Sequence, residues 1–190
     1  MKLSLYPKET MNNETAYEKW VWTELLGFDA KQQDGGAASY IQTLGFVPDV
    51  VSLLIGAPDI ILQHEGLEND AVLPKDFCAR DGHDGNEDRP TQIWTRVQLK
   101  TLVAELQRAG AKVFLSNFTH YLKDAFHEEW LSAHLEAQVS WAEDGRKTAL
   151  SVLTRVADGS YVQDFFAAQL QRVCQDYGFD GWHGPDGFGP

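Results

Sequence analysis

Apolar residues along this chain fall into short unbroken runs and into longer stretches with helical spacing. The run at 50–56 is bounded by Pro48 and Gly56 and rich in β-branched residues, which predicts a strand buried on both faces, as in a parallel sheet. Two further strands are predicted at 112–116 and 179–183, each within two residues of a glycine that ends a helical stretch. The chain therefore contains three expected buried strands.

Helical spacing of apolar residues predicts the elements between these strands. Two of the helices begin with capping-box sequences, Thr95 with Gln98 and Ser160 with Gln163. Two weaker features could be short strands, one at Ile60–Leu62 and one at 150–155. The helices are expected at 14–26, 37–44, from Thr95 to Gly110, at 124–138 and from Ser160 to Tyr177.

Buried strands that alternate with long helices predict an α/β fold with a parallel sheet and right-handed crossovers. We expect residues 1–47 to form a helical lead-in and residues 48–190 to form the first part of a (β/α)8 TIM barrel. Because a full barrel takes about 200 residues or more, the chain is expected to be part of a larger one. The alternative is a small α/β domain with 179–183 as an edge strand.

Charge and cysteine content narrow the function classes. The formal net charge of −12 argues against binding to nucleic acid or to an anionic membrane, since no basic patch could neutralise phosphates. Neither of the two cysteines, Cys78 and Cys174, belongs to a CxxC motif, which fits a reducing compartment. No signal peptide and no membrane-spanning run of about 20 apolar residues is seen, so we expect a cytoplasmic protein.

The densest group of candidate functional residues lies at the end of the last expected strand: Asp180, Trp182, His183 and Asp186. Alternate side chains of a strand share a face, so Asp180 and Trp182 should point one way and His183 the other. Two carboxylates beside an aromatic ring would suit glycoside hydrolysis, which uses a pair of carboxyl groups. The simpler alternative is that Asp180 orients a loop and Trp182 packs in the core.

The sequence Y-G-F-D-G-W-H-G-P-D at 177–186 resembles a strand of TIM-barrel glycoside hydrolases of the dextranase type, and A-K-V-F-L-S-N-F-T-H-Y-L at 111–122 resembles another strand of these barrels. The resemblance covers roughly residues 48–190. It implies an oligosaccharide substrate bound at the strand ends, with no cofactor. This chain departs from the family because the later strands, which usually supply the nucleophile and the acid, are absent.

Combining the residues with the resemblance gives a set of expected site residues. Asp186 and Asp180 are the expected carboxylates, and Trp182 is expected to stack on a sugar ring or to wall the pocket. The other expected substrate-binding residues lie at the end of a predicted strand or after one, and they are Asp59, His64, Asn117, His120 and His183.

Two alternatives to a glycosidase stay open. One is a non-catalytic domain that binds carbohydrate. The other is a metal-dependent hydrolase that uses His64, Glu65, His83, Asp84 and His120, although no HExxH spacing is present. The acidic loop at 81–88 begins like a calcium loop but departs from the EF-hand pattern at Arg89 and Thr95. Nucleophile-elbow, P-loop and dinucleotide motifs are absent.

Overall fold

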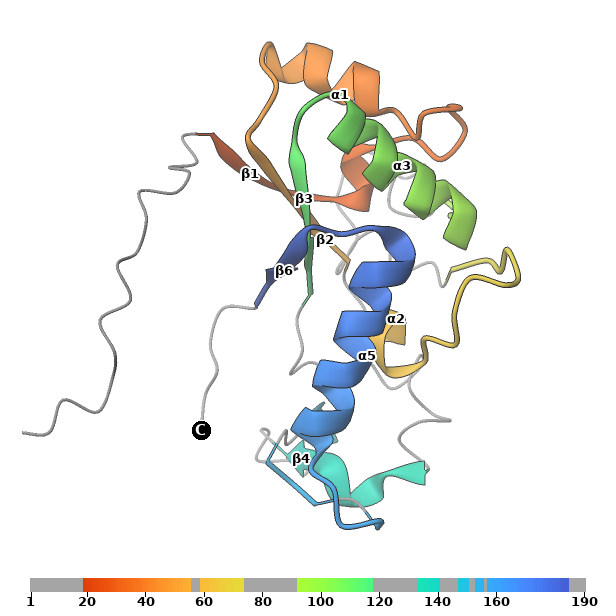
Figure 1. Cartoon of the computed structure of the whole chain (residues 1–190), viewed down its shortest axis with the longest axis vertical. Coiled ribbons are helices and arrows are strands. Elements are labelled where there is room, and N and C mark those ends of the chain that lie inside the picture. Colours follow the sequence, from red (N-terminus) through yellow and green to blue (C-terminus); the bar gives the residue numbers. More distant parts are fainter. Residues whose placement is uncertain are drawn as a thin grey trace, which may run out of the picture.

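The computed structural model describes residues 19–55, 59–73, 92–117, 133–140, 147–150, 153–155 and 157–184. Its centre is a parallel four-stranded sheet in which the strands lie side by side in chain order (Figure 1). The strands are β1 (Trp20–Glu24), β2 (Val50–Leu54), β3 (Lys112–Ser116) and β6 (Gly181–His183). The predicted α/β class with parallel strands is confirmed.

Strand β1 was not predicted. The helix expected at 14–26 is wrong over 20–24, where all five residues pair in register with β2, and a short 3-10 helix, η1 (Leu25–Gly27), follows. Pairing with β2 also lets the Trp20 and Trp22 side chains cover one face of the sheet while Val21 packs against the core. The sheet thus includes residues from the segment expected to be a helical lead-in, and the division at residue 47 stays a prediction.

The main helices end as their sequences predict. Helix α1 (Ala37–Leu44) stops at Gly45, and α5 (Val162–Tyr177) stops at Gly178, both left-handed glycines. Helix α3 (Arg96–Arg108) begins at the predicted capping box, in which the Thr95 hydroxyl accepts from the Gln98 N–H and the Gln98 side chain accepts from the Thr95 N–H.

Three local predictions fail. Residues 60–62, considered as a strand, instead belong to the one-turn helix α2 (Asp59–Leu62). The second capping box is not formed, because Tyr161 is the N-cap of α5 and the Ser160 hydroxyl instead donates to Asp158.

The third failure lies in the connection from β3 to α5, of which residues 118–132 lie outside the described residues. A 3-10 helix, η3 (Leu135–Ala137), is followed by an antiparallel hairpin of β4 (Gln138–Ser140) and β5 (Lys147–Leu150). The helix predicted to reach residue 138 is therefore wrong at its end, and the strand considered at 150–155 forms earlier, at 147–150.

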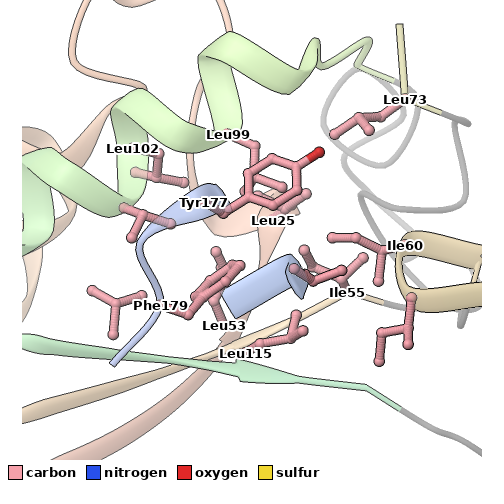
Figure 2. Packing of buried hydrophobic residues seen from close by; sticks show 14 of the residues in the cluster. Leu25, Leu53, Ile55, Ile60, Leu73, Leu99, Leu102, Leu115, Tyr177 and Phe179 are labelled. Carbon is pink, nitrogen blue, oxygen red and sulfur yellow. The ribbon is translucent and has the colours of Figure 1, made fainter. Parts of the chain in front are cut away.

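Helices α1, α3 and α5 lie on one side of the sheet and enclose the hydrophobic core (Figure 1). Leucines of β2, β3 and α3 pack there against the rings of Tyr177 and Phe179, which close the core where α5 returns to the sheet (Figure 2). No helix within the described ranges has the length and apolarity to cross a membrane. The other side of the sheet, called the open face below, carries Trp20, Trp22, Glu24, Ser52, Leu54, Phe114, Ser116 and His183.

Candidate functional site

The strand register places a row of side chains at the carboxyl end of the open face. Glu24 pairs with Leu54, Leu54 with Ser116, and Ser116 with His183, so the row crosses all four strands. The carboxyl ends of parallel strands are where α/β folds bind ligands. Glu24 gives the row a carboxylate and His183 an exposed imidazole.

Two tryptophans of β1 cover the polar residues of this face. The Trp22 indole N–H donates to Ser116 Oγ at 3.1 Å, and the Trp20 indole N–H donates to Ser52 Oγ at 2.6 Å. Both hydroxyls are buried, yet the indoles remain 46% and 55% exposed for Trp20 and Trp22. The open face is therefore an aromatic surface with an ordered polar layer beneath it.

His183 is held against this surface from β6. Its Nδ1 lies 2.9 Å from Ser52 Oγ, and its ring meets that of Trp20 edge-on with centroids 5.5 Å apart. Gly181 of the same strand leaves room for the Phe114 ring of β3, because a Cβ there would approach that ring to 3.3 Å.

Asp180 lies at the opposite end of β6. Its carboxylate accepts hydrogen bonds from the Val113 N–H at 2.9 Å, Gln107 Nε2 at 2.8 Å and Lys112 Nζ at 2.9 Å. Partial burial by itself raises the pKa of this carboxyl, but the three hydrogen bonds outweigh it and hold the pKa below its usual value. His183 lies three residue steps along the strand from Asp180, about 10 Å, so the structure does not bring the two together.

Trp182 points to the helix-covered side, as the predicted alternation requires. Its ring meets Phe166 of α5, and its indole N–H donates to Asn117 Oδ1 at 2.8 Å. Asn117 is fully buried at the end of β3, and in the described part of the chain its Nδ2 has no hydrogen-bond partner. The structure thus joins two expected site residues, Trp182 and Asn117, on the face opposite to His183.

His64 lies away from the strand ends, beside helix α5. Its ring is buried, forms a hydrogen bond between Nε2 and Asp176 Oδ2 at 2.7 Å, and contacts the Tyr177 ring. Gln169 and Arg172 of the same helix donate to backbone carbonyls of the segment 61–65. These contacts fasten that segment to α5, and they place His64 in the helix layer.

The structure describes only some of the other expected site residues. Asp59 is the first residue of α2, which follows the carboxyl end of β2. Asp186 and His120 lie outside the described residues, as do His83 and Asp84 of the metal hypothesis. Within the described ranges, no three His, Cys, Asp or Glu side chains are grouped so as to hold a metal ion.

Sequence reasoning missed five residues of the open face: Trp20, Trp22, Glu24, Ser52 and Ser116. The first three were assigned to a helix. The available signal was the run of aromatic and β-branched residues at 20–23, since these residue types are enriched in strands. The serines carry no sequence signal, because their role depends on which strand lies beside them.

Comparisons with known proteins support the fold. No family model matches the sequence, and no curated protein matches it. Among solved structures, a noncanonic maltogenic alpha-amylase, AmyB from Thermotoga neapolitana, is similar over 90% of this chain and 39% of its own length, with a TM-score of 0.52 and 11% identity. The chain thus spans about two fifths of that enzyme, and the likeness shows the fold alone.

Proposed function

We propose that this chain is the first part of a glycoside-hydrolase-type barrel and binds an oligosaccharide at the carboxyl ends of its strands. The observation that carries the proposal is the pair of exposed indoles, Trp20 and Trp22, beside the row of Glu24, Ser116 and His183. Aromatic rings bury the apolar faces of a sugar, and the polar row offers donors and acceptors for its hydroxyls. The alpha-amylase neighbour acts on carbohydrate, which supports this ligand class.

Each group of the row has a part that its chemistry allows. Trp22 would stack on a sugar ring, because it is the more exposed of the two indoles. It lies on the same face as Glu24 and two residues before it in β1, next to the row. His183 and Ser116 would hydrogen-bond hydroxyl groups.

For catalysis, we propose Glu24 and Asp186 as the carboxylates on this chain. Glycoside hydrolysis uses two carboxyl groups on either side of the bond to be cleaved. Glu24 stands in the row at the end of β1, and Asp186 follows β6 by three residues. We assign Asp180 a structural role, since its oxygens bind groups at the amino end of β3.

Titration calorimetry of the chain with α-1,4-linked gluco-oligosaccharides, and with β-linked ones for comparison, tests the proposal. We expect saturable binding that Trp22→Ala weakens about tenfold, a loss of 1.4 kcal/mol. Val97→Ala, which shortens an apolar side chain of similar exposure on α3, is the control and should bind as the wild type does. A folded wild-type chain that binds no oligosaccharide at millimolar concentration would refute the proposal.

Turnover separates an enzyme from a binding domain. Chromatography of the incubated oligosaccharide should show products if the chain is catalytic, and Glu24→Gln should abolish them while binding persists. Binding without products would favour the second candidate function, a non-catalytic carbohydrate-binding domain.

A further inference from the structure

Ser52 is a buried hydroxyl that joins two rings of the open face. It lies at the centre of β2 and is fully buried. Its Oγ is 2.6 Å from the Trp20 indole nitrogen and 2.9 Å from His183 Nδ1. A serine hydroxyl has one hydrogen to donate and two lone pairs that accept.

The chemistry of the two partners fixes the direction of each bond. An indole N–H only donates, so Ser52 Oγ is the acceptor from Trp20. If His183 Nδ1 carried a hydrogen, Ser52 would accept twice, and its own buried hydrogen would have no acceptor among the described residues. A buried donor without a partner is unfavourable. Ser52 therefore donates to His183 Nδ1, and the hydrogen of the neutral ring is on Nε2.

We propose that Trp20 and Ser52 are positioning residues that hold His183 as an Nε2–H donor at the carboxyl end of the sheet. The donor is presented outward, because His183 is exposed while Ser52 is buried. The edge-on Trp20 ring and the Ser52 bond together fix the plane of the imidazole. This subsite therefore selects a hydrogen-bond acceptor of the ligand. That the acceptor is a sugar hydroxyl or ring oxygen rests on the proposed function.

The ring nitrogens can be observed directly. Two-bond ¹H–¹⁵N correlation spectra at about pH 8.5, where imidazole is neutral in water, distinguish the tautomers, and a His183→Gln variant assigns the signals. We expect the wild-type His183 ring to show one tautomer, with an unprotonated Nδ1 and a protonated Nε2. In Ser52→Ala the Nδ1 signal should move toward that of a mixture of tautomers, and Ser52→Thr, which keeps the hydroxyl, should restore it.

The His64 ring, on the other side of the sheet, serves as the internal control and should not change in any Ser52 variant. A protonated Nδ1 in the wild type would overturn the proposal, and this measurement needs no variant to fold. A ring spectrum of folded Ser52→Ala identical to the wild type would also overturn it.

Ligand binding separately tests whether the His183 subsite selects a hydrogen-bond acceptor. If the wild type binds oligosaccharide, Ser52→Ala should weaken binding at least threefold and Ser52→Thr should not; equal affinity in Ser52→Ala would refute the selection of an acceptor. If the wild type shows the expected tautomer but binds no sugar, the positioning of His183 stands and the proposed function fails.

Discussion

Replacing Asp180 with alanine removes the acceptor of three hydrogen bonds at the amino end of β3 and β6. The Val113 N–H is partly buried and loses its partner outright, which costs about 1–2 kcal/mol. Gln107 and Lys112 can turn to water, and Lys112 is 56% exposed, so each adds roughly 0–1 kcal/mol. We expect a loss of about 2–3 kcal/mol in the free energy of unfolding, a large share of the 5–15 kcal/mol typical of a domain.

Urea unfolding followed by circular dichroism measures this loss. Asp180→Asn keeps a side-chain oxygen for the Val113 N–H and should lose about 1 kcal/mol. Asp164→Ala, which removes an exposed carboxylate from the first turn of α5, is the control and should lose less than about 1 kcal/mol.

The stabilisation by Asp180 also depends on pH in a definite direction. Because the folded state lowers the pKa of this carboxyl, the stabilisation is fully present above the unfolded pKa of about 3.9 and is lost as the pH falls through the lower folded pKa. Asp180→Ala should therefore show a weaker fall of stability in acid. If Asp180→Ala were as stable as the wild type but lost sugar binding or turnover, a structural role for this residue would be refuted.

Three further predictions concern single side chains. Trp182→Phe removes the indole donor to Asn117 and should lower the free energy of unfolding by about 1–3 kcal/mol in urea; an unchanged midpoint would show that this bond contributes nothing. Burial raises the pKa of Tyr177 to about 12, so this tyrosine should hold its proton while unfolded tyrosines near pH 10 lose theirs. Stability should then fall between about pH 10 and 12, and alkaline absorbance titration of Tyr177→Phe should lack the late step. Thr95→Ala breaks the capping box with Gln98 and should cost about 1 kcal/mol in thermal unfolding, whereas Thr95→Ser should be nearly neutral.

The sequence by itself determined the elements whose signals are local. Helices α1, α3 and α5 follow from apolar spacing and from the glycines that end them, and β2 and β3 follow from short apolar runs that come soon after Pro48 and Gly110. Parallel pairing of the three predicted strands follows from the helices between them, because a crossover returns the chain in the same direction.

Only the tertiary structure decided the identity of β1 and the composition of the open face. A five-residue strand such as β1 is stabilised by its neighbour β2, and the stretch around it has enough apolar residues at helical spacing to suggest a helix. Once β1 is in place, Trp20 and Trp22 cover serines that lie 32 and 94 residues away in the chain, and Glu24 joins the row that ends in His183. These contacts depend on the register across four strands, which no local pattern encodes. Asp180 and His183 are only three residues apart in the sequence, but strand β6 carries the chain from the amino end of the sheet to its carboxyl end and so separates them.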